Sequence, residues 1–376
     1  MSAGVGFAEA ILTELSTLNP ANYPGMKVTQ PGFLVQLLNN QTRPNVIETA
    51  GYANGHRVPS VNVRYMRRST QGQWQTGNPD CGIDVVPAFL ETSVTINQAN
   101  HFGMFLGEDQ IRQYEQEASA IVNNNTTGGV PMMSMVAKAL FHQLQGGYLA
   151  INAALLTAMS TRVGRNARNS LTNTTVNFNQ LGTTNLFSEG WGRIAADIEE
   201  SEICGPMWMV GNGNPHIYMK QLQNSALSFN QSGLSNSNIA AGLGGNFMWD
   251  RQTATALGAN TLLVAAENSV HFLEYNENVG NFAGQKGAVI DFQIVDPFMQ
   301  CWTPAGMQPF RWDCTLRYND CPTQYTGYAG TTTYQKGWHL IIYKKYDLFV
   351  TPTNAYDGAD ANRNQNGTLL FTITNT

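Results

Sequence analysis

Charged side chains are what this sequence has least of. Only 12% of its 376 residues are Asp, Glu, Lys or Arg, about half the share usual in a soluble globular protein. Uncharged polar residues, with Asn at roughly one position in ten, and 36 glycines make up the difference. This composition excludes a coiled coil, a highly charged disordered tail and a membrane bundle. The net charge of −5 leaves no basic excess for phosphates, so sequence-specific DNA binding is not expected.

Long apolar runs and a cysteine framework are also missing. The longest apolar stretch, residues 149–159, is interrupted by Asn152 and is far shorter than the roughly 20 residues that span a membrane. The first lysine is Lys27, so the charged start of a secretory signal is absent and we expect no export. The five cysteines are an odd number scattered through a long chain, which fits a reducing compartment better than a disulfide scaffold.

The first quarter of the chain predicts an arm and then a finger. Residues 1 to about 48 hold four prolines and little periodicity after a short amphipathic piece, so we expect an arm that becomes ordered on a partner surface. Two later runs have the period of two that is typical of strands: Val61, Val63 and Tyr65, and Thr92, Val94 and Ile96. With the polar residues 67–84 as its tip, this finger is marginal as two strands alone and must lie on something else.

The middle of the chain predicts a long helix. Between residues 131 and 161, apolar side chains recur at steps of three and four: Val136, Leu140, Leu144, Tyr148, Ile151, Leu155 and Met159. Such a helix is about 45 Å long and acts as a structural beam, with Gly146 and Gly147 as places where it can bend. A shorter helix is predicted from Glu108 to about residue 122, because Glu108 and Asp109 make its first turn acidic.

The second half alternates predicted helices and strands. A helix is expected at residues 186–201 and another at 214–222, where Asn214 is a good N-cap and Pro215 a good first helical residue. Strands are expected near 174–179 and at 207–210, 247–250, 261–265, 270–275, 289–295, 310–319, 338–350 and 369–373. The predicted fold class is α+β, with an α/β lobe in this half.

No motif for a nucleotide or a metal is convincing. The segment Gly211-Asn212-Gly213-Asn214-Pro215-His216 follows a strand as a dinucleotide fingerprint does, but it has His216 in place of the third glycine and no acid about 20 residues later. Cys301, Cys314 and Cys321 match no common zinc spacing, and Cys314 is expected to be a buried thiol. Residues 360–367 imitate a calcium loop without its central glycine and terminal Glu. We therefore expect no cofactor and no metal.

No catalytic group is predicted either. The six histidines share no local string with a Ser or Cys nucleophile. Carboxylate pairs such as Glu267 with Glu274, or Asp291 with Asp296, have the residue types of a glycosidase couple, but nothing in the sequence prefers them over ordinary surface acids. The protein is not expected to be an enzyme.

One basic cluster remains at the finger: Arg64, Arg67 and Arg68. In a chain with so few charges, ion pairing between subunits with an acidic partner surface is the favoured interpretation. A nucleic-acid contact and a plain solvated face are the alternatives. Glu108 and Asp109 are the acidic candidates for the same kind of inter-subunit contact.

The order of these parts resembles the major capsid proteins of tailed bacteriophages, which have the Hong Kong 97 type of fold. The most specific local likenesses are RIAADIEESEICGPMWMVGNGNPHIYMKQL and FMWDRQTATALGANTLLVAAENSVHFLEY, which look like axial-domain segments. The resemblance implies five parts: an N-terminal arm (1–50), an extended loop (51–106), a peripheral domain (107–185) with a spine helix (131–161), an axial domain (186–300), and strands that return to the peripheral domain and end in a C-terminal extension (301–376).

What the resemblance implies is assembly without catalysis. Copies of the chain would form pentamers and hexamers that build an icosahedral head around double-stranded DNA, which they would contact non-specifically. The chain has no long charged helix at its start to act as a built-in scaffold, so the resemblance implies a separate scaffolding protein, together with a portal and, as a further class, decoration proteins. The location implied is the virion, assembled in the cytoplasm of the bacterial host, with no membrane contact.

Two other functions stay open. An encapsulin-like shell would share the fold but enclose a cargo enzyme. A β-rich attachment or carbohydrate-binding protein is the rival of a different class, because strands rich in Asn, Thr and Gly and poor in charge suit it as well. The long helix and the arm argue against this rival.

Overall fold

The structure is a computed structural model of an α+β protein, as predicted. It describes residues 11–16, 18, 28–39, 46–50, 60–66, 89–108, 132–178, 186–203, 206–220, 245–267, 269–277, 282–286, 289–302, 309–326, 332–353 and 366–375. The chain divides into two compact units, each assembled from three stretches of sequence. Unit 1 comprises Met1–Thr29, Gln98–Ile151 and Glu274–Tyr346, and unit 2 comprises Gln30–Asn97, Asn152–Leu273 and Asp347–Thr376.

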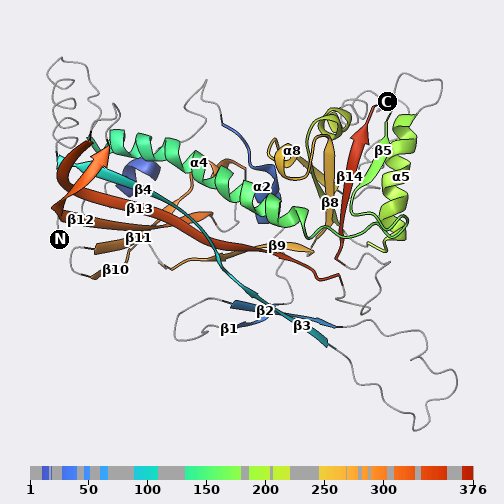
Figure 1. Ribbon diagram of the computed structural model, residues 1–376, viewed down its shortest axis with the longest axis horizontal. Coiled ribbons are helices and arrows are strands. Elements are labelled where there is room, and N and C mark those ends of the chain that lie inside the picture. The colour runs from blue at the N-terminus through green and yellow to red at the C-terminus, as the bar shows by residue number, and fades with distance from the viewer. Residues whose placement is uncertain are drawn as a thin grey trace, which may run out of the picture. The chain divides into compact units, whose positions relative to one another are not determined.

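The predicted long helix is confirmed as α4, Met132–Ser160, with 29 residues (Figure 1). Its buried positions within unit 1 follow the helical period: Val136, Ala137, Leu140, Phe141, Leu144, Tyr148 and Ile151. The ring of Phe141 stacks on Phe298 with 4.3 Å between centroids, and Tyr148 meets the edge of Trp302 at 5.8 Å. The Tyr148 hydroxyl donates to the carbonyl oxygen of Thr29 at 3.1 Å. Aromatic packing therefore fixes the unit 1 part of α4.

Unit 1 is built on an antiparallel sheet with the strand order β10-β11-β12-β13-β4. β9, of which residues 270–273 belong to unit 2, also pairs with β13. The strands are β4 (Gln98–Gly107), β9 (Val270–Tyr275), β10 (Phe282–Lys286), β11 (Val289–Val295), β12 (Arg311–Thr326) and β13 (Thr332–Val350). On β12, Trp312, Cys314 and Leu316 are buried as the predicted alternation requires, but Asp313 between them is buried as well. β4 was expected within the extended loop, but it pairs with β13 along its whole length.

The two adjacent glycines of α4 provide a matched test of this packing. A Cβ on Gly146 would meet nothing within 4 Å, whereas a Cβ on Gly147 would lie 2.8 Å from Cη2 of Trp312. We expect Gly146→Ala to raise the free energy of unfolding by about 0.5 to 1 kcal/mol, because alanine favours the helix. Gly147→Ala is expected to lower it by about 1 to 3 kcal/mol, because the indole must move. Urea unfolding of both variants checks this, and equal effects would contradict the packing.

Unit 2 contains a five-stranded mixed sheet with the order β5-β14-β8-β6-β7. Its strands are β5 (Thr174–Asn177), β6 (Met207–Gly211), β7 (Gly245–Trp249), β8 (Thr261–Ala266) and β14 (Thr368–Thr374), and helix α5 spans Leu186–Glu200. All six residues of β8 are buried, as expected of a central strand with both faces covered. β14 comes from the C-terminal stretch predicted as an extension, yet it lies between β5 and β8. β14 is thus part of this core.

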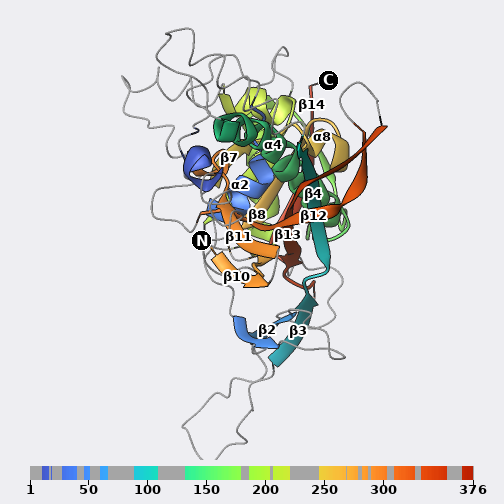
Figure 2. The same cartoon turned by 90° about the vertical axis from the view of Figure 1, so that its left-hand side faces the viewer.

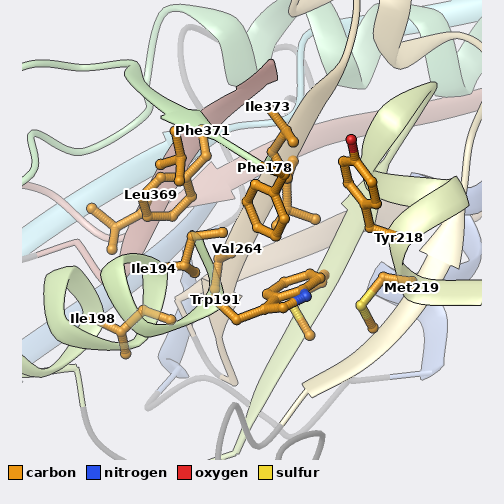
Figure 3. Close-up of a cluster of buried hydrophobic side chains, with 13 residues drawn as sticks. Phe178, Trp191, Ile194, Ile198, Tyr218, Met219, Val264, Leu369, Phe371 and Ile373 are labelled. Carbon is orange, nitrogen blue, oxygen red and sulfur yellow. The ribbon is translucent and has the colours of Figure 1, made fainter. Parts of the chain in front are cut away.

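The hydrophobic core of unit 2 gathers side chains from α5, the sheet and residues 214–220, which are helical (Figure 3). Phe178 has no exposed surface; it stacks on Tyr218 with 5.0 Å between centroids and meets the edge of Trp191 at 5.1 Å. A Cβ on Gly190 would lie only 2.6 Å from the Phe178 ring, so α5 approaches the ring directly at that glycine. Bulky aromatic side chains thus join α5 to the sheet.

Helix α2, Gly32–Asn39, was not predicted, and unlike the expected extended arm it is buried in unit 2. Polar side chains far away in sequence hold its first turn. Oδ2 of Asp250 accepts a hydrogen bond from the Phe33 amide at 2.8 Å, and Oδ1 of Asn152 accepts one from the Leu34 amide at 2.8 Å. These side chains accept hydrogen bonds from amide groups in the first turn, which have no partner within the helix itself. Residues 32–39 are therefore a core element that needs no partner subunit to cover them.

The remaining differences from the predicted elements are few. The strand β1, Val46–Ala50, pairs with β2 and makes the predicted two-stranded finger a three-stranded sheet. At the predicted N-cap Asn214, the side chain instead donates to the carbonyl of Ile373 at 3.1 Å, while Oδ1 of Asn260 accepts from the Asn214 amide at 3.0 Å. The predicted helix after Glu108 lies outside the described residues beyond that first position.

Candidate functional site

The three-stranded sheet of unit 2 carries the finger predicted from the sequence (Figure 2). β2 (Ser60–Met66) and β3 (Phe89–Thr95) pair in antiparallel register from Ser60↔Thr95 to Met66↔Phe89. Val61, Val63 and Tyr65 of β2 are buried, and Tyr65 stacks on Phe349 with an interplanar angle of 11°. The apolar face of the sheet is thus covered within unit 2.

The opposite face of this sheet is polar and exposes Arg64. Its Nε lies 3.3 Å from Oε2 of Glu91 on the neighbouring strand, and the two side chains are 44% and 48% exposed. An ion pair this exposed contributes less than about 1 kcal/mol. Arg64 therefore has an acidic neighbour in its own chain, which sequence reasoning missed, and still offers an accessible guanidinium. Arg67 and Arg68 lie outside the described residues.

Of the acidic candidates, the structure describes Glu108. This residue follows β4 in unit 1, is exposed, and accepts a hydrogen bond from the Tyr318 hydroxyl at 2.7 Å. Asp109 lies outside the described residues. The carboxylate of Glu108 is thus positioned by β12 and remains open to solvent.

A second exposed element is the far end of the β12–β13 hairpin. β11 pairs with β12 as far as Arg317, and β4 pairs with β13 as far as Gly337. Beyond these positions β12 and β13 pair with each other up to Thr326↔Thr332, and no other described strand accompanies them. This two-stranded ribbon carries Tyr334, which is 68% exposed. An exposed aromatic side chain on this ribbon is a candidate contact surface, and the sequence analysis did not identify it.

A shallow apolar groove lies beside β4 in unit 1. It has a volume of about 430 Å³ and is lined by residues of β4 and α4 together with Trp312 and Ile342. Phe102 on its rim is 38% exposed. The groove adds to the apolar surface that this unit leaves open to solvent.

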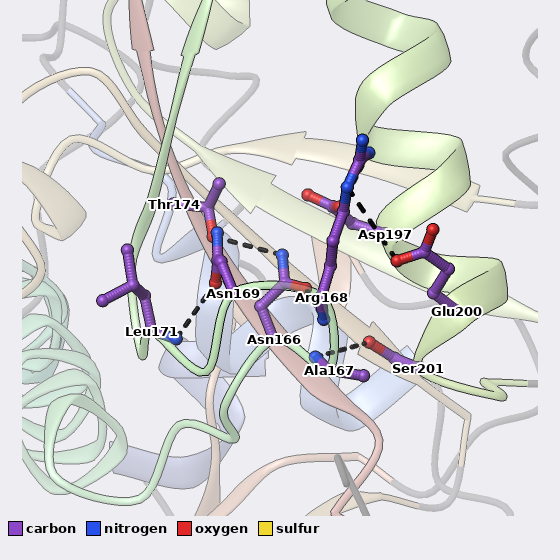
Figure 4. Close-up of polar contacts among 9 residues, drawn as sticks. All are labelled: Asn166, Ala167, Arg168, Asn169, Leu171, Thr174, Asp197, Glu200 and Ser201. Carbon is purple, nitrogen blue, oxygen red and sulfur yellow. Dashed lines mark hydrogen bonds and ion pairs between the residues drawn. The ribbon is translucent and has the colours of Figure 1, made fainter. Parts of the chain in front are cut away.

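On unit 2, a polar corner joins a turn after α4 to the end of α5 (Figure 4). Arg168 lies 3.7 Å from Asp197 and 4.0 Å from Glu200, while the Ala167 amide donates to the Ser201 hydroxyl at 3.4 Å. Arg168 is 53% exposed and Asp197 only 4%. The guanidinium therefore offsets the negative charge of a nearly buried carboxylate and holds the turn against the helix.

Several described residues considered for catalysis or metal binding lie buried within the fold. Cys314 is fully buried, as predicted, and burial raises the pKa of its thiol well above the usual range. Among the described residues, no group of three or more His, Cys, Asp or Glu side chains is placed to hold a metal ion. In the imitated nucleotide loop, Asn212 is buried and donates to Thr253 and Thr261. Most of the imitated calcium loop lies outside the described residues.

Asp296, from one of the carboxylate pairs, is a buried structural acid of unit 1. Its Oδ2 accepts from Nε1 of Trp312 at 2.7 Å, and its Oδ1 accepts from the amides of Phe298 and Met299 at 2.9 and 3.0 Å. Burial raises the pKa of Asp296 to about 6, and these three hydrogen bonds oppose the rise. Asp291 instead accepts from the Thr315 hydroxyl at 2.8 Å. Asp296 thus ties the turn after β11 to β12.

The raised pKa makes Asp296 a source of pH-dependent stability. Because its folded pKa of about 6 lies above the unfolded value of 3.8, the folded chain binds the proton more tightly. The stabilisation is complete below about pH 4 and is lost as the pH rises through about 6, a change of about 3 kcal/mol. We expect Asp296→Asn to lack this component, measured by urea unfolding of both proteins across that pH range. Parallel pH profiles would contradict the assignment.

Comparison with known proteins gives structural likenesses only. No family model and no curated protein matches the chain. The Cyanophage A-1(L) capsid asymmetric unit is similar with 11% identity, 94% of this chain and 95% of that chain covered, and a TM-score of 0.48. The capsid structure of the Cyanophage P-SCSP1u is 11% identical, with 94% of this chain and 92% of that chain covered and a TM-score of 0.41. The capsid of Myoviridae Phage XM1 is 11% identical, with 95% of this chain and 99% of that chain covered and a TM-score of 0.37.

All three are phage capsid structures, and each match covers more than nine tenths of this chain. None of the described helices is long and apolar enough to cross a membrane. Among the described residues, exposed features that could make contacts include the Arg64 face, Glu108, the β12–β13 ribbon and the groove beside β4.

Proposed function

We propose that the chain is the major capsid protein of a tailed double-stranded DNA phage. The order of its elements supports this proposal. β2 and β3 flank residues 67–88, and the 29-residue helix α4 follows. Next come α5 and strands β6 to β8 of the five-stranded sheet, and the long strands β12 and β13 precede the last strand, β14. This is the order that the resemblance to Hong Kong 97-type capsid proteins requires.

Copies of the chain would assemble into pentamers and hexamers that close an icosahedral shell. Closed symmetry lets each copy use the same surfaces, so the exposed Arg64 face, the ribbon with Tyr334 and the groove with Phe102 would be covered by neighbours. A composition with 12% charged residues suits large interfaces, because few ions would be buried without partners. No step of this assembly requires catalysis or a cofactor.

The proposal includes partners and a location. A separate scaffolding protein would guide assembly, a portal would occupy one vertex, and decoration proteins would bind the outer surface. The shell would enclose double-stranded DNA with non-specific contacts, as suits a chain with a net charge of −5. Assembly would take place in the cytoplasm of the bacterial host, and the protein would end in the virion. The proposed domains are the arm (1–50), the extended loop (51–106), the peripheral domain (107–185), the axial domain (186–300) and the C-terminal part (301–376). Within this division, α2 of the arm is buried in unit 2, and β4 at the end of the extended loop pairs with β13.

Negative-stain electron microscopy with size-exclusion chromatography of the purified chain tests the proposal. At rising concentration and with a mild crowding agent we expect shells, tubes or discrete hexamers and pentamers. A chain that stays monomeric or trimeric under all conditions, and that binds glycans, would contradict the proposal and favour the attachment protein. A closed shell that takes up an enzyme as cargo and forms without scaffold or portal would favour the encapsulin-like alternative.

A further inference from the structure

A buried lysine of β13 in unit 1 touches both a carboxylate and a primary amide. The Lys344 side chain has no exposed surface, and its Nζ lies 2.5 Å from Oε2 of Glu274 and 2.8 Å from Oδ1 of Asn276. The same nitrogen donates to the carbonyl oxygen of Arg311 at 2.8 Å. Three oxygens from two other strand regions therefore hold one ammonium group at a fixed point.

The Lys344 side chain is shielded from bulk solvent. Its Nζ lies 4.9 Å from the centre of the Phe310 ring, and Phe310 is itself buried. A lysine is almost never fully buried, because desolvating an ammonium costs several kcal/mol even when a carboxylate is near. Lys345, the next residue, shows the ordinary arrangement: it is 35% exposed and pairs with Glu277. The contact of the Asn276 amide with the buried Lys344 is therefore additional to the ion pair with Glu274.

We propose that Lys344 and Asn276 form an isopeptide bond within the chain, with Glu274 as the group that moves the protons. Glu274 takes a proton from the Lys344 ammonium, and the resulting amine attacks Cγ of Asn276. The Nζ–Cγ bond forms, the Cγ–Nδ2 bond breaks, and the amide nitrogen leaves as ammonia after receiving a proton through Glu274. Overall, one ammonium and one primary amide give one secondary amide and one ammonium ion. No oxidant or cofactor is consumed.

The environment favours this reaction in two ways. Fixed contacts at 2.5 and 2.8 Å hold the amine, the carboxylate and the amide together, which replaces a bimolecular encounter by a unimolecular step. The product also replaces a buried ion by a neutral amide, which removes the cost of keeping an ammonium away from water. The bond would join the end of β9 to β13 and does not depend on the proposed capsid function.

Intact-mass and peptide mass spectrometry of the purified, folded wild-type chain test the proposal. We expect a mass lower than the sequence mass by one ammonia molecule. Because trypsin does not cleave after an acylated lysine, we also expect one branched peptide that joins residues 276 and 344. An unchanged mass would overturn the proposal. A loss of ammonia with Lys344 still cleavable would overturn it too, because an Asn succinimide would then explain the loss.

Two arginine variants assign the nucleophile. Lys344→Arg keeps the positive charge without an acylatable amine and is expected to restore the full mass. Lys345→Arg, the matched control, is expected to keep the mass loss. The reverse pattern would overturn the assignment to Lys344. If Lys344→Arg does not fold, the branched peptide of the wild-type chain decides alone, because it identifies both partners directly.

Discussion

Replacing Phe178 by alanine is expected to lower the free energy of unfolding by about 3 to 5 kcal/mol, which is a large part of the stability of an ordinary domain. The ring has no exposed surface, stacks on Tyr218 and meets the edge of Trp191. Its removal leaves a cavity that cannot collapse easily, because the ring lies directly against the backbone of α5 at Gly190. Urea unfolding of the unassembled chain, followed by tryptophan fluorescence, measures the loss.

Leu171→Ala is the matched control for this experiment. Leu171 belongs to the same unit but is 54% exposed, so its truncation is expected to change the free energy of unfolding by less than about 0.5 kcal/mol. The structure predicts a difference of several kcal/mol between two single truncations of large apolar side chains. Similar losses in both variants would contradict the assignment of Phe178 to the core.

The elements found from the sequence are those whose burial follows a period. In α4 the apolar side chains recur at helical spacing, so its bounds could be predicted within one residue. The alternating start of β12 was predicted as closely, but the strand continues to Thr326, seven residues beyond the predicted end. Helix α2 was missed because it has only eight residues, follows Pro31 and is buried on nearly every side, which leaves no amphipathic pattern. Its first turn is completed by Asp250 and Asn152, contacts that no local pattern contains.

The same distinction applies to the candidate sites. Arg64 stood out because charges are scarce, but its partner Glu91 is 27 residues away and is brought near only by the β2–β3 register. Lys344 and Asn276 are 68 residues apart, so their contact depends on β9 lying beside β13. Side chains that strand pairing brings together from distant parts of the chain have no characteristic spacing in the sequence, so sequence analysis cannot identify them. The scarcity of charged residues, in contrast, can be seen directly in the composition.

Replacing Arg64, Arg67 and Arg68 together by glutamate is expected to leave the monomer folded and to abolish shell formation. In the monomer, Arg64→Glu would lose the exposed pair with Glu91 and place two like charges opposite each other, at a cost of less than about 1 kcal/mol. At a contact between subunits, the same change would set acid against acid in every repeated interface, which excludes assembly. Unfolding measurements on the triple variant test whether the monomer stays folded, and electron microscopy tests whether shells still form.

Net charge alone needs a control, since a more acidic chain repels its own copies. Arg165, Arg193 and Arg251 are exposed, and their joint replacement by glutamate makes the same change in charge elsewhere on unit 2. We expect this control to keep assembling. Normal shells from the variant with the three finger arginines replaced would show that these residues make no essential contact, and loss of assembly in both triple variants would mean that total charge is responsible.

A double exchange separates the partner surface from the pair within the chain. Arg64→Glu combined with Glu91→Arg restores an ion pair between β2 and β3, because the two residues face each other in register. If Arg64 acts only through Glu91, shells of the double variant form as in the wild type. If Arg64 meets an acidic surface of a neighbouring subunit, exchanging the two charges moves the guanidinium to the other strand and the loss of assembly persists. We expect the loss to persist, because a guanidinium 44% exposed beside its own partner still has donors to offer a second carboxylate.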